Sequence, residues 1–140
     1  MASIEPTGKK LAALLGAEDD GKPLVMINLL RYRDRAAYAD GSGEEPCSGR
    51  EAYLRYGTAA APCIEKAGAK MVAGGAVQLV VIGPDTEEWD DFFLVRYPNK
   101  QAFLDMVSDP EYQAIAHHRT AALADSRLVA TSEGGLFGQD

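Results

Sequence analysis

Residues 24–30 read Leu-Val-Met-Ile-Asn-Leu-Leu, and every position except Asn28 is apolar. A strand with one face in water alternates apolar and polar side chains, whereas this stretch is apolar on both alternating sets of positions. The stretch Phe92-Phe-Leu-Val95 has the same character. The sequence therefore predicts two strands that are covered on both faces.

The neighbouring segments are predicted from helix caps and turn residues. Ser48-Gly-Arg-Glu51 has the pattern of a capping box at a helix start, and Asp109-Pro110 has that of an N-cap followed by proline at the first helical position. In chain order we expect a helix over 6–15, a strand over 24–30 and a polar loop over 31–47, which serves as a surface loop or a binding lid. A helix over 48–67, bent at Pro62, should follow, and then a strand over 71–82 that is interrupted at Gly74-Gly75, a turn over 83–87 and a strand over 88–97. The chain should end with a helix that begins at 98, restarts at 110 and ends at 122, a strand over 126–131 and a frayed tail over 132–140.

This order is β-α-β-β-α-β after an extra amino-terminal helix, the split pattern of a ferredoxin-like α+β sandwich. The length of 140 residues suits one domain, residues 1–140 with a core over 4–131. Helices in such a fold cover one face of the sheet, so the two doubly apolar strands leave a second face uncovered. We therefore predict a homodimer whose two sheets stack as a dimeric α+β barrel.

Composition argues against several kinds of partner. The 14 basic and 21 acidic residues give a net charge of −7, which repels nucleic acids and anionic lipid surfaces. No apolar run approaches the roughly 18 residues of a membrane helix, and the first residues lack the pattern of a secretory signal. Cys47 and Cys63 have no CxxC or metal-site spacing. We expect a cytoplasmic protein with reduced thiols that binds neither nucleic acid nor membrane.

Three segments carry a resemblance to a known family. They are Val25-Met-Ile-Asn-Leu-Leu-Arg-Tyr-Arg-Asp34, Tyr97-Pro-Asn-Lys-Gln-Ala-Phe103, and Asp109-Pro-Glu-Tyr-Gln-Ala-Ile-Ala-His-His-Arg119 together with Asp125-Ser-Arg-Leu128. Over residues 4–131 the chain resembles the bacterial family called domain of unknown function thirteen-thirty. The resemblance implies the dimeric α+β barrel superfamily. That superfamily contains monooxygenases, cyclases, isomerases, dehydratases and haem-degrading enzymes beside binding modules, so the fold does not choose a reaction.

Arg119 is the first candidate for chemistry. It shares one face of the predicted helix with Tyr112, Ile115 and Ala116, which carries its guanidinium toward the sheet. A guanidinium removed from water needs a partner, either the carboxylate or enolate of a bound molecule or an acid of the chain such as Asp125 or Asp91. The pairing with an acid of the chain is the favoured alternative.

His117 and His118 are the only histidines. A helix turns by about 100° between neighbours, so we expect that the two rings do not point into one pocket. The adjacent pair also lacks the i,i+4 spacing of a helical metal site, so we predict no metal. His118 is the candidate general base or haem ligand. The resemblance brings no haem-ligand pattern, so we expect neither haem nor another cofactor.

The predicted ligand-binding residues are polar or aromatic groups near the sheet. Asn28 lies within an apolar strand and needs a partner, which is a ligand, a water, the neighbouring backbone or Arg31. Tyr53 and Tyr56 either direct phenols into a cavity or pack in the core. The full set is Asn28, Tyr53, Tyr56, Tyr112 and Asp125 for ligand binding, with His118 and Arg119 as catalytic residues.

The sequence contains no Gly-rich phosphate loop and no Ser-His-Asp arrangement, which argues against common hydrolases and nucleotide-dependent enzymes. We predict a protein that binds a small organic acid or aromatic compound, and that either is a cofactor-independent oxygenase, isomerase or cyclase or has no activity. The alternative is a non-catalytic accessory protein or structural dimer module. Convergence of Asn28, Tyr53, Arg119 and His118 on one cavity would favour the first function.

Overall fold

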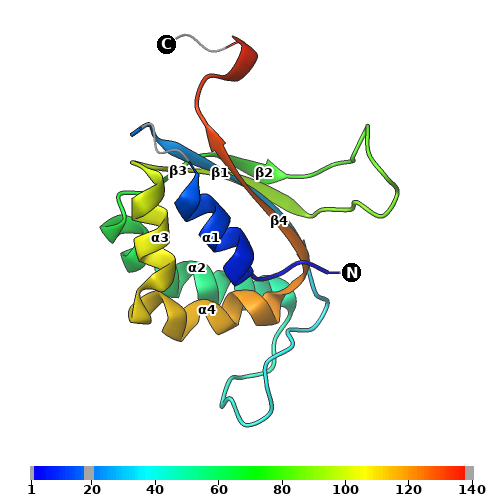
Figure 1. Cartoon of the computed structure of the whole chain (residues 1–140). Coiled ribbons are helices and arrows are strands. Elements are labelled where there is room, and N and C mark those ends of the chain that lie inside the picture. The colour runs from blue at the N-terminus through cyan, green and yellow to red at the C-terminus, as the bar shows by residue number, and fades with distance from the viewer. Residues whose placement is uncertain (1, 18–20, 138–140) are drawn as a thin grey trace.

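A four-stranded antiparallel sheet forms the frame of the computed structural model, which describes residues 2–17 and 21–137 (Figure 1). Its spatial order is β2-β3-β1-β4, the order of a ferredoxin-like fold. The strands are β1 (Leu24–Tyr32), β2 (Lys70–Ala76), β3 (Asp91–Tyr97) and β4 (Leu123–Ser132), and the helices in the described ranges are α1 (Gly8–Gly16), α2 (Gly49–Lys66), α3 (Lys100–Ser108) and α4 (Pro110–Ala122). Within these ranges, no helix has the length and apolar character needed to traverse a lipid bilayer.

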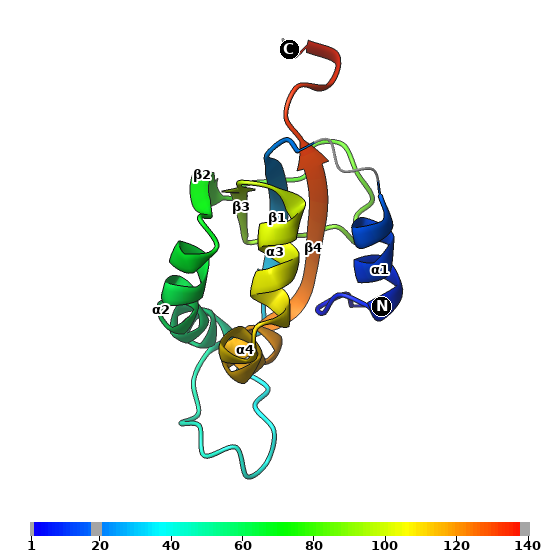
Figure 2. The same ribbon diagram turned by 60° about the vertical axis from the view of Figure 1, so that its left-hand side comes forward.

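All of these helices pack on the same side of the sheet (Figures 1 and 2). Leu24 and Met26 of β1 are buried there, together with Phe103 of α3. Leu11 and Leu14 of α1 pack against the same cluster. The amino-terminal helix therefore adds to the helical layer and does not cover the other face of the sheet.

The opposite face of the sheet has an apolar centre, with Arg96 and Arg127 beside it, and is called the open face below. The register pairs Ile27 with Leu94 and Val129, and Leu29 with Phe92, so these side chains point to one side. Val129 is 48% exposed. No helix in the described part of the chain lies over the open face, whose apolar residues are Val25, Ile27, Leu29, Phe92, Leu94 and Val129.

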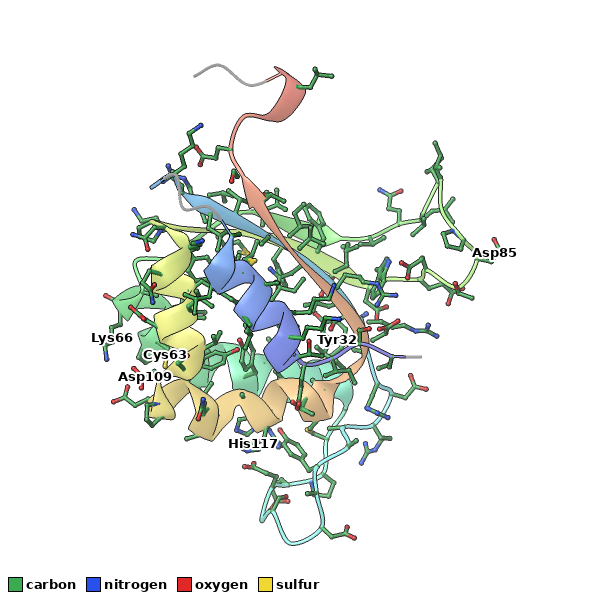
Figure 3. All side chains as sticks on the ribbon, viewed as in Figure 1. Tyr32, Cys63, Lys66, Asp85, Asp109 and His117 are labelled. Atoms are coloured by element: carbon green, nitrogen blue, oxygen red, sulfur yellow. The ribbon has the colours of Figure 1, made fainter. Side chains whose placement is uncertain are left out.

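The predicted starts of α2 and α4 are confirmed. The Ser48 hydroxyl accepts from the Glu51 amide at 3.1 Å, and the Glu51 carboxylate accepts from the Ser48 amide at 3.2 Å. Asp109 caps α4 and also pairs with Lys66 at the end of α2, at 3.2 Å (Figure 3). The α2 helix continues through Pro62 without interruption.

The predicted bounds of the hairpin strands are wrong. The β2–β3 ladder ends at the pair Ala76 and Asp91, and the Val77 amide closes it by donating to the Asp90 carbonyl at 2.9 Å. Residues 77–90 beyond this point form a projecting loop with Asp85 near its tip (Figure 3). The irregularity in β2 lies between Met71 and Ala73 instead of at the two glycines.

Three other bounds also differ from the prediction. The β4 strand begins at Leu123, which is fully buried and pairs with Tyr32 across a register shift. The α1 helix begins at Gly8, because the Thr7 side chain accepts from the Lys10 amide. In the predicted tail, residues 135–137 form a 3₁₀ turn, and residues 138–140 lie outside the described residues.

Gly49 is required by close backbone packing where α2 meets the 33–48 loop. A Cβ atom there would lie 2.6 Å from the Ala122 carbonyl oxygen and closer still to the Arg33 carbonyl oxygen. Gly49→Ala should therefore lower the free energy of unfolding by about 1–3 kcal/mol, because backbone must move. Gly57→Ala, also in α2, meets nothing within 4 Å and should raise stability by about 0.5–1 kcal/mol. Urea denaturation of both variants tests this, and equal effects would contradict it.

Candidate functional site

A cavity of about 720 Å³ lies between the helices and the sheet, partly open to solvent. This volume is in the range of small-molecule sites. Its apolar walls include Met26, Ile64, Phe93, Val95, Phe103 and Leu128. A wall of this kind suits the apolar part of a small organic molecule.

The cavity brings together most of the predicted site residues. Asn28 comes from β1, Tyr53 and Tyr56 come from α2, and Tyr112 and Arg119 come from α4. The sheet positions agree with the register, because Asn28 pairs with Phe93 and with Leu128, and both line the same cavity. The polar groups therefore converge from three elements on one apolar space.

The tyrosines form a connected aromatic group. The hydroxyls of Tyr56 and Tyr112 lie 2.8 Å apart, and the Tyr53 ring stacks on Phe93 with centroids 6.3 Å apart. Burial raises the pKa of Tyr56, and Tyr112 adds to this rise. Burial also raises the pKa of Tyr53, although the positive charge of Arg119 acts in the opposite direction. The phenols of Tyr53 and Tyr56 are therefore protonated at neutral pH and able to donate hydrogen bonds.

Arg119 has no acidic partner in the described part of the chain. Its Nη1 donates to the Ile4 carbonyl at 2.5 Å. Asp125 instead pairs with Arg127 at 2.9 Å, and Asp91 accepts from the Tyr32 hydroxyl at 2.6 Å. The favoured prediction of an ion pair between Arg119 and one of these acids is therefore wrong, because both acids bind other groups.

Asn28 is partly satisfied by the backbone. Its Nδ2 donates to the Met26 carbonyl at 3.3 Å, which is one of the alternatives expected for this residue. Its Oδ1 accepts no hydrogen bond from any described residue, and the side chain lines the cavity. The amide therefore presents a free acceptor to the cavity.

Two of the predicted site residues lie elsewhere. His118 does not line the cavity, and its Nδ1 is 2.6 Å from the hydroxyl of Tyr38 in the 33–48 loop. Asp125 accepts from the Ser3 amide at 2.8 Å, besides Arg127. Burial alone would raise the pKa of Asp125, but its hydrogen bonds lower it overall. Asp125 therefore fixes the amino-terminal segment to β4.

Sequence reasoning missed two groups that line the cavity. Tyr97 is buried on the same face of β3 as Phe93 and Val95, and the two-residue spacing could have indicated it. Glu5 lines the cavity and accepts from the Thr120 hydroxyl at 2.7 Å. Nothing in the sequence pattern indicates Glu5, because it comes from an irregular segment before α1.

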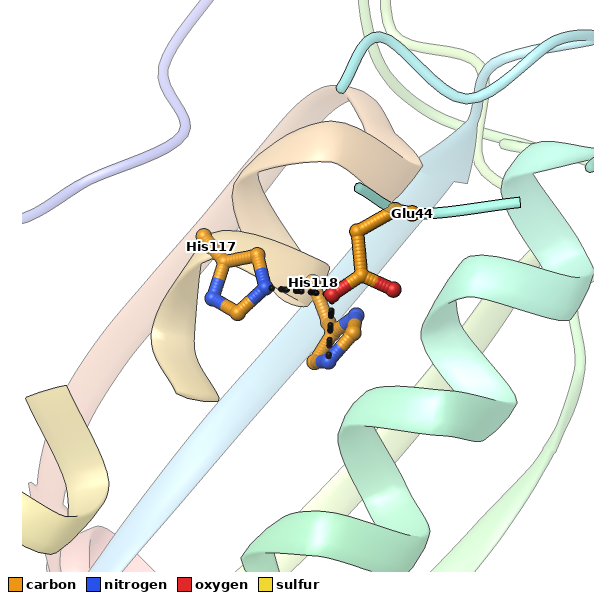
Figure 4. A group of neighbouring side chains, drawn as sticks. All are labelled: Glu44, His117 and His118. Atoms are coloured by element: carbon orange, nitrogen blue, oxygen red, sulfur yellow. Dashed lines mark hydrogen bonds and ion pairs between the residues drawn. The ribbon is translucent and has the colours of Figure 1, made fainter. Parts of the chain in front are cut away.

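The histidines form a separate group at the surface. The two rings have centroids 4.1 Å apart, and their Nε2 atoms lie 3.2 Å (His117) and 3.9 Å (His118) from Glu44 Oε1 (Figure 4). The two rings lie side by side although the helix turns by about 100° between the residues, and none of the cavities in the described part of the chain is lined by both. Burial and the neighbouring His117 lower the pKa of His118, although Glu44 opposes this.

Comparisons with known proteins identify relatives of this chain. The model of the family described as Domain of unknown function (DUF1330) matches residues 46–132. A crystal structure of RPA0582, a protein of unknown function from Rhodopseudomonas palustris, is 40% identical with a TM-score of 0.85, and covers 94% of this chain and 97% of that one. Its methylated form is 41% identical with a TM-score of 0.86, and the coverage is 94% of each chain.

A more distant structure, from Bacteroides fragilis, is described as a dimeric protein of unknown function with a ferredoxin-like fold. It is 15% identical with a TM-score of 0.49, and the match covers 82% of this chain and 99% of that one. No curated protein shows significant similarity to the chain. The family model matches more than half of the chain, and the chain belongs to the DUF1330 family.

Proposed function

We propose that the cavity binds a small organic acid with an aromatic or other apolar body, and that its carboxylate lies against Arg119. The observation that carries this proposal is a guanidinium that lines an apolar cavity and has no acidic partner among the described residues. A cation in such surroundings is stabilised by an anion that forms charge-assisted hydrogen bonds. A ligand carboxylate supplies both the charge and the planar geometry.

The remaining groups of the cavity complement such a ligand. Phe93 and Phe103 offer apolar surface to a ring or chain, and the Asn28 Oδ1 atom offers an acceptor. The phenols of Tyr53 and Tyr97 supply donors, since burial raises the pKa of both. A few polar groups in an apolar cavity fix the orientation of a ligand.

The same groups support binding more than proton-transfer catalysis. Among the described residues that line the cavity, Glu5 is the only carboxylate and no histidine is present. Glu5 is hydrogen-bonded to Thr120, and His118 lies outside the cavity. The chemistry of a cofactor-independent isomerase or cyclase requires a positioned base. We therefore favour a ligand-binding role over an enzymatic one.

We also infer that two copies of the chain pair through their open faces. Apolar side chains from the two central strands and β4 form the centre of the open face, and the helices lie on the other side of the sheet. A contiguous apolar surface of this kind is unfavourable in water, and an identical surface is its simplest cover. Such a dimer has the two sheets facing each other.

Paired probes test the ligand class directly. Aromatic carboxylates such as benzoate should bind to the purified protein at least about tenfold more tightly than the matching carboxamides, because only the anion forms charge-assisted hydrogen bonds. Isothermal titration calorimetry measures the affinities, and native mass spectrometry identifies any acid retained through purification. Equal affinity for the two probes would contradict the proposal.

A further inference from the structure

We propose that Glu44, His117 and His118 bind a divalent transition-metal ion of the zinc class. The three residues each offer one donor atom, and these atoms all lie within 4.8 Å of one another. Glu44 comes from the 33–48 loop and the histidines come from α4, so the ion would join two segments that are distant in sequence (Figure 4). This site is separate from the proposed ligand cavity, which none of the three residues lines.

The spacing of the donors suits a tetrahedral ion. Zinc bonds of about 2.0–2.1 Å in tetrahedral geometry place neighbouring donors roughly 3.3 Å apart. His117 Nε2 and Glu44 Oε1 are 3.2 Å apart, and His118 Nε2 is 3.9 Å from the same oxygen. Small side-chain rotations would bring all three donors onto one ion. Two imidazoles and one carboxylate are a donor set that zinc uses when a fourth position holds water.

Tyr38 orients one of the ligands. Its hydroxyl lies 2.6 Å from His118 Nδ1, which leaves His118 Nε2 directed toward Glu44. Metal-binding histidines in proteins commonly use their second nitrogen in a hydrogen bond of this kind, which fixes the ring and the tautomer. The His118 side chain is only 13% exposed, so the ring is already held in place.

The loop that carries Glu44 is also fixed before any ion binds. The Ala37 amide donates to the Ala121 carbonyl of α4 at 2.8 Å, and the Glu44 amide donates to the Ser42 hydroxyl at 3.2 Å. Arg55 lies 3.8 Å from Glu44 Oε2, the carboxylate oxygen that does not face the histidines. The positive charge of Arg55 opposes a cation, so we expect moderate affinity from a site that is nevertheless preformed.

The fourth position would be open to solvent. The side chains of His117 and Glu44 are 46% and 28% exposed, so water can reach the ion from outside. No sequence pattern indicates this site, because the histidines are adjacent and the third ligand lies more than seventy residues away. Folding of the loop onto α4 creates the site.

Metal titration of tag-free, chelator-treated protein tests the proposal. We expect one Zn²⁺ per chain, measured by competition with a chromophoric chelator, and visible absorption bands of tetrahedral Co²⁺ as an independent signature. His117→Ala and Glu44→Gln should each weaken Zn²⁺ binding at least about tenfold, and Tyr38→Phe should weaken it about tenfold through the lost orientation of His118.

Glu45→Gln is the matched control, because the neighbouring acid is not part of the cluster and should leave Zn²⁺ affinity unchanged. Circular dichroism of each variant confirms that it folds. The proposal is overturned if wild-type protein binds no Zn²⁺ at micromolar concentration, if Co²⁺ shows only octahedral bands, or if Glu44→Gln and Glu45→Gln behave alike.

Discussion

Ile27→Glu should convert a dimer of about 30 kDa into a monomer of 15.0 kDa. Ile27 lies at the centre of the open face, between Leu94 and Val129 of the adjacent strands. Around a two-fold axis, one substitution places two carboxylates in the same apolar contact. Like charges in an interface cost several kcal/mol, so the dissociation constant should rise by roughly a thousandfold. Sedimentation velocity at micromolar concentration measures the change.

A matched substitution on another surface controls for the added charge. Leu54 of α2 is also apolar and is 71% exposed, but it lies on the helical side of the molecule. Leu54→Glu should therefore leave the dimer intact. The proposed interface would be wrong if wild-type protein sediments as a monomer, or if both variants dissociate to the same extent.

Much of the fold was predictable because local signals and the hydrophobic pattern agree. The Ser48 and Asp109 caps fix two helix starts, and they follow from side chains that satisfy free amides nearby. The end of β2 was not predictable, because Val77 and the apolar residues after it resemble a strand in isolation. Only the length of the partner strand β3, which begins at Asp91, decides where pairing stops.

The candidate site also has a part that the sequence predicts and a part that it does not. Helical spacing correctly placed Tyr112 and Arg119 on one face, because both residues lie on one regular element. The partners of Arg119 could not be predicted from spacing. They depend on tertiary contacts: Arg119 donates to the Ile4 carbonyl, and Asp125 pairs with Arg127 instead. The Glu44 and histidine group depends on a loop conformation that no periodicity encodes.

Arg119→Met should strongly weaken binding of an aromatic carboxylate while the protein remains folded. Loss of a buried charged partner typically costs about 2–5 kcal/mol, so affinity should fall roughly thirtyfold or more. Stability should fall by about 1–2 kcal/mol, because the guanidinium donates to the Ile4 carbonyl. Breaking a buried ion pair would cost more, about 3–5 kcal/mol, but no acid pairs with Arg119 among the described residues.

Thermal melting and calorimetry with benzoate separate these two effects, and Arg50→Met provides the control. Arg50 pairs with Asp90 at 3.5 Å, its side chain is 63% exposed, and it does not line the cavity. Its replacement removes the same charge and should leave carboxylate affinity unchanged. A stability loss above about 3 kcal/mol for Arg119→Met would indicate a structural role for the guanidinium. Unchanged benzoate affinity in that variant would show that Arg119 does not bind the carboxylate. The proposed role of Arg119 would then be wrong.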